Sequence, residues 1–169
     1  MSEVELIKDL GRIEEVCKDK QNENWIFNVI LKHRVPKELN SIVNKLYREI
    51  SSQIDCKKCA NCCKSLRVRL DNEDIENFCK GLGADPDGFR EQYLAKCETG
   101  EYIFNTMPCP FLENNLCSNY EHRPKKCRSF PHLDKDDFII RLADISLVYP
   151  ICPIVFNLYE RLKNDIDFQ

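Results

Sequence analysis

Apolar residues recur three and four positions apart in five stretches of the chain, which is the pattern of helices with one buried face. We therefore expect helices over residues 2–18, 36–54, 71–83, 85–97 and 150–164. The clearest apolar stripe runs through Leu39, Val43, Leu46 and Ile50. A shorter apolar segment, residues 25–31, lies between the first two helices. The pattern predicts a mostly α-helical protein.

Residues at several helix ends agree with these limits. Ser2 and Glu5 fit a capping box, Pro36 suits a first helical turn, and Asp71 is a typical N-cap. Between the helices, residues 66–70 alternate between apolar and polar, which predicts a short strand. Residues 138–142 are expected to be extended. Residues 102–131 are rich in turn formers, and residues 113–115 suit the turn of a small hairpin.

The most informative feature of the composition is the number of cysteines. The chain has 169 residues, a formal net charge of −3 and eleven cysteines. No apolar run approaches the roughly 20 residues that span a bilayer, and the acidic start lacks the layout of a signal peptide. We therefore expect a cytosolic protein whose thiols stay reduced, and the odd number of cysteines also argues against a disulfide framework. The net charge offers no general attraction to nucleic acid or anionic membranes.

The cysteines fall into two groups. Cys17, Cys79 and Cys97 lie on the apolar faces of expected helices, where a thiol behaves as a small hydrophobic side chain. The remaining eight lie in turns or at helix ends, where side chains can converge, and we expect them to bind metal: Cys56, Cys59, Cys62, Cys63, Cys109, Cys117, Cys127 and Cys152. The strongest signal is the run Cys56-x2-Cys59-x2-Cys62-Cys63, because two-residue spacers let a tight turn direct two sulfurs to one ion.

The number of sites and the metal stay open. Cys62 and Cys63 are adjacent, and neighbouring side chains usually diverge, so they suit two metals or one ligand with a second thiol behind it. Eight thiols divide into two four-thiolate sites, but a single site with spare thiols fits equally well. The Cys109-Pro110 and Cys152-Pro153 pairs resemble the distant ligand of a four-iron iron–sulfur cluster. Zinc also accepts a Cys-x2-Cys pair with a remote pair.

These cysteines and their neighbours resemble the CxxCxxCC cysteine-cluster family. The resemblance covers residues 56–152. Its further segments are Val68-x-Leu70, Asp74-Ile75, Cys109-Pro110-Phe111-Leu112, Cys117, Tyr120-x2-Arg123-Pro124-x2-Cys127-Arg128-x-Phe130-Pro131 and the late Cys152. It implies a domain that chelates zinc or iron. Similar domains also occur in flagellin lysine methylases, which leaves a methyltransferase-type modifying enzyme as an alternative.

Basic residues surround the cysteines. Arg123 and Arg128 flank Cys127 and are expected to stabilise the negative charge of a bound metal–thiolate centre. His122 and His132 lie nearby, but eight thiols already suffice as ligands. No group of residues suits nucleophilic catalysis, so we assign no catalytic residue. No nucleic-acid motif with stacking aromatics is present.

The expected fold is a small, mostly α-helical single domain with short β-strands, in which metal staples the cysteine-bearing loops. It consists of an N-terminal helical segment, residues 1–55, and a cysteine-cluster region, residues 56–169. The expected function is that of an accessory, electron-transfer or metal-handling protein. Its expected partners are a metal ion and another protein, and no membrane is expected. A zinc-stabilised interaction module is a further alternative.

Overall fold

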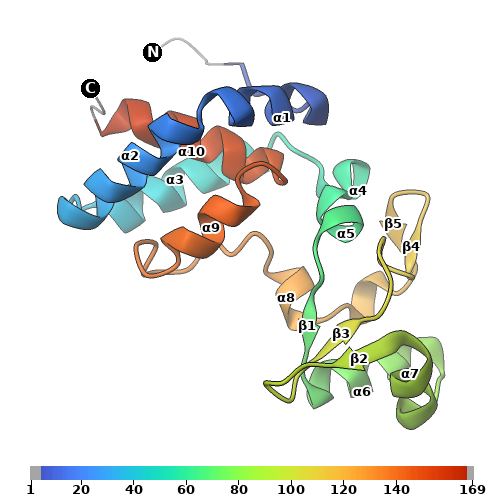
Figure 1. Ribbon diagram of the computed structural model, residues 1–169. Helices are drawn as coiled ribbons and strands as arrows, with labels where there is room; N and C mark the ends of the chain where they lie inside the picture. The colour runs from blue at the N-terminus through green and yellow to red at the C-terminus, as the bar shows by residue number, and fades with distance from the viewer. Residues whose placement is uncertain (1–4, 167–169) are drawn as a thin grey trace. The chain divides into compact units, whose positions relative to one another are not determined.

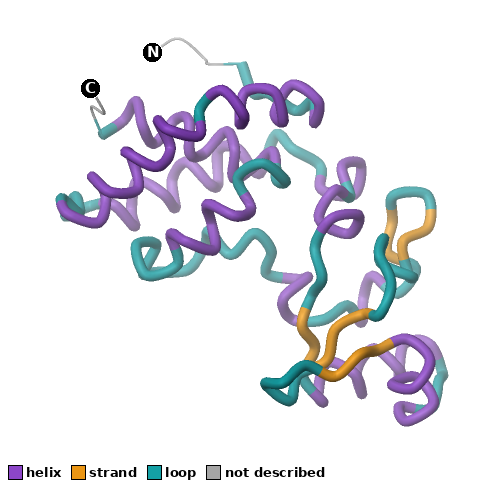
Figure 2. Tube along the Cα trace, in the orientation of Figure 1, coloured by secondary structure: helices purple, strands orange, loops and turns teal. Residues whose placement is uncertain are grey.

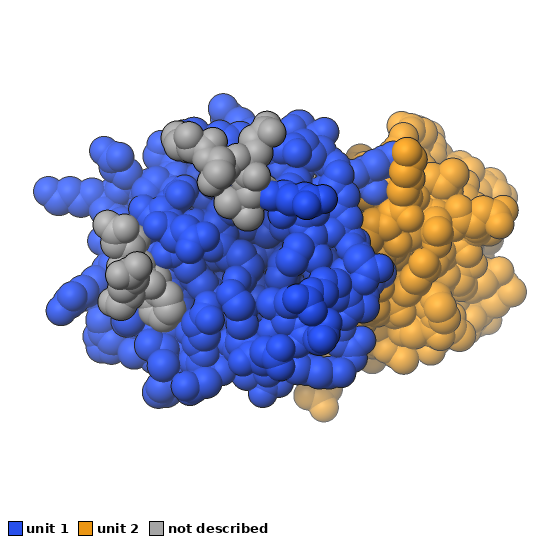
Figure 3. All heavy atoms as spheres, turned by 90° about the horizontal axis from the view of Figure 1, so that it is seen from above, with its two compact units in different colours: residues 1–55, 131–169 blue, residues 56–130 orange. Residues whose placement is uncertain are grey.

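The computed structural model describes residues 5–166 and divides the chain into two compact units (Figures 1 and 3). Unit 1 contains residues 1–55 and 131–169, and unit 2 contains residues 56–130. The division after Asp55 coincides with the start of the cysteine cluster. The chain therefore begins unit 1, makes all of unit 2, and then returns to complete unit 1.

Unit 1 consists of helices (Figure 2). Its elements are α1 (Leu10–Asp19), α2 (Gln21–His33), α3 (Leu39–Ser51), α9 (Leu142–Val148) and α10 (Pro153–Asp165). Helix α10 packs against α3 and α1 and is buried along most of its length. Its Ile154, Val155, Leu158 and Leu162 side chains are almost fully buried, as the apolar stripe of the sequence predicts. Asn157 on α10 also accepts a hydrogen bond from the backbone N–H of Ile7.

Unit 2 combines short helices with two small sheets. Its elements are α4 (Cys56–Cys59), α5 (Asn61–Ser65), β1 (Arg69–Leu70), α6 (Asn72–Leu82), α7 (Pro86–Tyr93), β2 (Leu94–Lys96), β3 (Tyr102–Phe104), β4 (Leu112–Glu113), β5 (Leu116–Cys117), the 3₁₀ helix η1 (Tyr120–His122) and α8 (Lys125–Arg128). One antiparallel sheet has the order β1-β3-β2, and β4 pairs with β5. Helix α6 contacts β1, α7 and η1.

An aromatic core holds unit 2 together. Phe78 on α6 lies 4.8 Å from Phe111 and 5.6 Å from Phe89, measured between ring centroids. Phe104 on β3 joins the same cluster, with its ring 5.7 Å from that of Phe111. Because Phe111 lies two residues after Cys109, this core fixes the Cys109 loop against α6.

Three sequence predictions are confirmed closely. Asp71 forms a capping box at the start of α6, and Gly83 ends this helix in a left-handed conformation. Asp85 caps α7, whose first residue is Pro86. Asn114 and Asn115 both have positive φ and turn the β4–β5 hairpin, as a two-residue turn of this kind requires.

Three other predictions are wrong. Helix α1 begins at Leu10 with Asp9 as its N-cap, so Glu5 lies before the helix, and Ser2 falls outside the described residues. Residues 138–142 form turns leading into α9 rather than an extended segment. Helix α7 ends at Tyr93, so Cys97 lies in the loop between β2 and β3 and is only half-buried. Cys17 and Cys79, in contrast, are buried on helices as expected.

A helix that spans a membrane has to be both long and apolar. Within residues 5–166, no single helix is both long enough and apolar enough to cross a membrane. Helices α9 and α10 reach the required length and composition only when taken together, as a pair bent by 119°.

Candidate metal centre

Four thiols from four separate elements come together in unit 2. Cys63 lies on α5, Cys109 lies in the loop before β4, Cys117 ends β5, and Cys127 lies on α8. We call these four residues the thiol tetrad. Negative charge on Cys63 raises the pKa of each of the other three thiols, and charge on Cys109 or Cys117 raises that of Cys127. The four sulfurs therefore lie within electrostatic reach of one another.

Backbone hydrogen bonds connect the loops that carry the tetrad. The N–H of Cys109 donates to the carbonyl of Cys63 at 2.9 Å, which joins the first cysteine cluster to the Cys109 loop. The N–H of Ser118 donates to the carbonyl of Phe111 at 2.9 Å, next to Cys117. The first bond joins segments that lie far apart in the sequence and the second closes the β4–β5 hairpin, so the backbone itself brings Cys63, Cys109 and Cys117 together.

Burial makes three of the four tetrad thiols unusually weak acids. Burial raises the pKa of the Cys109 thiol to about 11 and that of Cys127 to about 12, and it also raises the pKa of Cys117. Cys63 differs because the Cys62 thiol, 3.9 Å away between the sulfurs, donates to it and lowers its pKa to about 7. Cys63 is therefore the member of the tetrad that ionises most readily.

The pair Cys62 and Cys63 does not diverge as neighbouring side chains usually do. Their sulfur separation of 3.9 Å is close to the about 3.8 Å between two sulfurs on one tetrahedral zinc ion, given zinc–sulfur bonds of about 2.3 Å. Cys62 is thus close enough to act either as a hydrogen-bond donor behind Cys63 or as a ligand beside it.

The other expected ligands lie in different surroundings. Cys56 is exposed and Cys59 is half-buried on α4, which Ala60, with a left-handed φ of 50°, separates from α5. Cys152 belongs to unit 1, where it is buried at the start of α10. The other seven expected ligands all belong to unit 2.

The thiol tetrad is not closed around a point. Among residues 5–166, no three Cys, His, Asp or Glu side chains converge in the arrangement of a finished metal site. All eleven cysteines are thiols rather than disulfides. The donor set suits a soft metal, because four thiols are available, but the side chains have to move inward to reach a common ion.

Arg123 is the basic residue whose charge acts on Cys117 and Cys127, while Lys64 acts on Cys63. Arg123 favours the thiolate forms of Cys117 and Cys127, against the opposing effect of burial. Its guanidinium lies 3.6 Å from the ring centroid of Tyr120 and donates to the Tyr120 carbonyl at 2.6 Å. Lys57 of α4 also lies over this ring, at 4.8 Å, so Tyr120 connects the first cysteine cluster to η1. Arg128 lies on α8 with an exposed side chain.

Helix α6 holds the segment between Cys117 and Cys127, a role that the sequence analysis did not identify. The buried Asn119 donates from Nδ2 to the carbonyl of Phe78 at 2.8 Å, and Asn77 donates to the carbonyl of His122 at 3.1 Å. The Asp74 carboxylate accepts from the N–H of Lys125 at 2.8 Å. The available signal for Asp74 and Asn77 was their spacing of three residues beside the apolar Ile75 and Phe78, whereas nothing local marks Asn119.

The close packing of α6 against η1 makes Gly81 sensitive to substitution. A Cβ at Gly81 would lie 2.2 Å from Oδ1 of Asn119 and 2.5 Å from Cδ2 of His122. Replacing glycine by alanine usually stabilises a helix by about 1 kcal/mol. We expect Gly81→Ala instead to destabilise unit 2 by about 1–3 kcal/mol, because the methyl group overlaps buried atoms. Denaturant unfolding of both proteins measures the difference.

Gly88 on α7 provides the matched control for this prediction. Its added Cβ would meet only Oδ2 of Asp85, at 3.6 Å, which is an ordinary contact. Gly88→Ala should therefore be neutral or stabilising. A Gly81→Ala protein as stable as Gly88→Ala would contradict the close approach between α6 and η1.

Comparison with known proteins gives one result. Residues 55–145 match the family CxxCxxCC, described as a "putative zinc- or iron-chelating domain". No curated protein and no solved structure matches the chain. The match covers a little over half of the chain and includes every member of the thiol tetrad. The chain therefore belongs to the CxxCxxCC family.

Proposed function

We propose that unit 2 is a thiolate metal-binding domain that holds a zinc ion or an iron–sulfur cluster. The observation that carries this proposal is the gathering of Cys63, Cys109, Cys117 and Cys127 from four separate elements. Core packing alone does not require four thiols in one place, whereas soft-metal ligation does. The protein then acts as an accessory, electron-transfer or metal-handling protein.

The charge around the tetrad supports this proposal. Four thiolates on one zinc ion leave a net charge of about −2, which nearby cations stabilise. Arg123 supplies such a cation next to Cys117 and Cys127. Its stacking on Tyr120 holds the guanidinium in place, so the compensating charge does not depend on a freely moving side chain.

The experiment that tests the proposal is anaerobic purification of the full chain, followed by elemental analysis and an absorption spectrum. An iron–sulfur cluster gives visible absorption that decreases on reduction, which would indicate electron transfer. Zinc is silent in the visible range and would indicate a structural or metal-handling role. A chain that retains neither metal, even after incubation with zinc or with iron and sulfide, would overturn the proposal.

The raised thiol pKa values make metal binding depend on pH. Cys109 and Cys127, with pKa values of about 11 and about 12, stay protonated at neutral pH when no metal is bound. The raised pKa of Cys117 has the same effect, whereas Cys63, with a pKa of about 7, is about half ionised at pH 7. Thiols must lose these protons to bind metal, so affinity should rise with pH.

We expect the tetrad to release between about three and four protons per ion at pH 7, since three thiols are protonated and Cys63 is partly ionised. Titration calorimetry with zinc in buffers of different ionisation enthalpy measures this number. Competition titrations between pH 6 and pH 8 should show the affinity rising steeply. An affinity that is independent of pH would exclude these thiols as the ligands.

A further inference from the structure

One face of α6 contacts the segment between Cys117 and Cys127 at several points. Asp74, Asn77, Phe78 and Gly81 lie at positions i, i+3, i+4 and i+7, so they share one face of the helix. Phe78 and Asn77 bind Asn119 and His122 of the segment, and Gly81 provides the closest approach. The C-terminal part of this segment, which carries Cys127, is held by Asp74.

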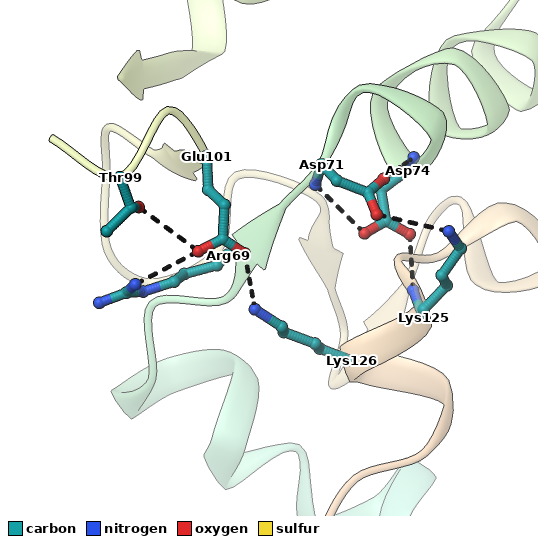
Figure 4. Close-up of polar contacts among 7 residues, drawn as sticks. All are labelled: Arg69, Asp71, Asp74, Thr99, Glu101, Lys125 and Lys126. Carbon is teal, nitrogen blue, oxygen red and sulfur yellow. Dashed lines mark hydrogen bonds and ion pairs between the residues drawn. The ribbon is translucent and has the colours of Figure 1, made fainter. Parts of the chain in front are cut away.

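Asp74 uses both of its carboxylate oxygens in this contact region. Oδ1 accepts from the backbone N–H of Lys125 at 2.8 Å, and Oδ2 lies 3.4 Å from the backbone N of Asp71 (Figure 4). The residue is 4% exposed, although a charged side chain is rarely buried without partners. The hydrogen bond also connects distant parts of the chain, because Asp74 and Lys125 lie 51 residues apart.

Helix α8 needs this support from outside. It is four residues long, from Lys125 to Arg128, and a helix of this length is not stable alone. Its N-cap residue is Pro124, whose side chain makes no capping hydrogen bond. The Asp74 carboxylate replaces this missing cap from another helix by accepting the N–H of the first residue of α8. Cys127 follows that residue by two positions.

We propose that Asp74 is a positioning residue of the metal centre. Its carboxylate fixes the backbone of α8 to α6 and thereby keeps the Cys127 thiol within reach of the other three thiols. This inference rests on the proposed function of the tetrad. Asp74 itself is not a ligand, because its two oxygens are occupied by the backbone groups of Lys125 and Asp71.

The neighbouring ion pairs contribute less to this attachment. Lys125 Nζ lies 2.6 Å from Glu73 and 3.4 Å from Asp71, and Lys126 Nζ lies 2.9 Å from Glu101. The two lysine side chains are about half exposed, at 47% and 49%, and solvent screens ion pairs of this kind. A charge-assisted hydrogen bond to a buried carboxylate is stronger.

The test compares Asp74→Ala with Asp71→Ala. Both substitutions destroy the capping box of α6, in which each side chain accepts from the backbone of the other residue. Only Asp74→Ala also removes the acceptor for the N–H of α8. Both variants therefore lose the capping box, and the Lys125–Asp71 ion pair that Asp71→Ala also removes is exposed to solvent. An additional loss of affinity in Asp74→Ala reports on the backbone attachment of α8.

Two measurements are made on the full-length proteins. A chelator competition titration with zinc gives the affinity, and we expect Asp74→Ala to weaken it about tenfold or more relative to Asp71→Ala, the range seen when partners of metal ligands are removed. Alkylation by a thiol reagent, followed position by position with mass spectrometry, should show faster labelling of Cys127. Cys63 and Cys109 should be labelled as in the wild type.

Asp74→Asn provides a second variant with the same shape. An amide retains one acceptor oxygen, so its affinity and Cys127 labelling should fall between those of the wild type and Asp74→Ala. If Asp74→Ala does not fold, Asp74→Asn is compared with Asp71→Asn in the same measurements. Equal affinities in the matched pair, or uniform labelling of all four thiols, would overturn the positioning role.

Failure of this inference differs from failure of the proposed function. If the wild type binds no zinc, iron or cluster, the proposed function is wrong. Labelling of the metal-free chains then still tests Asp74, because Cys127 is shielded by its packing as well as by metal. Selective labelling of Cys127 in Asp74→Ala would support the attachment of α8, and unchanged labelling would refute it.

Discussion

Cys127→Ser should leave the purified chain without bound metal. Burial raises the pKa of the Cys127 thiol to about 12, so this thiol stays protonated at neutral pH unless a metal ion displaces its proton. Serine has nearly the same shape, but its hydroxyl oxygen is a poor ligand for a soft metal site. Elemental analysis of anaerobically purified protein measures the loss, which we expect to be nearly complete.

Cys79→Ala is the control for this substitution. Cys79 is 2% exposed on α6 and belongs to the apolar core of unit 2, so alanine should leave the metal content unchanged. The same analysis on Cys152→Ser tests the expected ligand that belongs to unit 1. Full metal occupancy in Cys127→Ser would remove this thiol from the ligand set.

Metal removal should expose the amides of residues 109–130 to hydrogen exchange. Binding energy becomes folding energy where the site does not exist in the unfolded chain, and structural zinc supplies about 10–16 kcal/mol in small domains. In unit 2 this segment is held by hydrogen bonds with α6 and by Phe111, so under the proposed function the bound ion is its main additional support. We expect protection in this segment to fall by several orders of magnitude.

Helix α3 is the internal reference for that experiment. Its Val43, Leu46 and Ile50 side chains are buried in unit 1, so their packing does not depend on the thiols of unit 2. Exchange in α3 should stay slow after chelation, and adding metal back should restore protection in residues 109–130. Unchanged exchange after verified metal loss would show that unit 2 folds independently of its metal.

The helices that the sequence predicts best are those with local end signals. Asp71 and Gly83 limit α6, and Pro153 begins α10 only three residues after its expected start. The predicted helix limits are wrong where residues bind parts of the chain that are distant in sequence. Leu94–Lys96 leave the helical pattern because they pair with β3, and no local signal announces that pairing.

The start of α1 is an error of a different kind. Ser2 and Glu5 have the spacing of a capping box, but Asp9 provides the competing cap by accepting from the N–H of Arg12. Ile7 is also bound to Asn157, 150 residues away, which holds this part of the chain outside the helix. Two capping signals close together cannot be ranked without knowing such long-range bonds.

In the candidate site, too, local features could be predicted from the sequence and long-range contacts could not. Apolar helix faces visible in the sequence separate Cys17 and Cys79 from the eight expected ligands, but the same pattern assigned Cys97 to a helix that ends before it. Spacing does not divide the eight among sites, since the grouping of the tetrad depends on how α5, β5 and α8 are brought together. The contribution of Asp74 is equally invisible, because its partner lies 51 residues further along the chain.

The interruption of unit 1 by unit 2 has a consequence for synthesis on the ribosome. Chains emerge from their N-terminus, and compact units generally fold as soon as they are complete. Residues 56–130 emerge before α9 and α10, so α3 at that stage lacks the helix that covers its apolar face. All of unit 2, with the four thiols of the tetrad, therefore emerges before the helical unit can close.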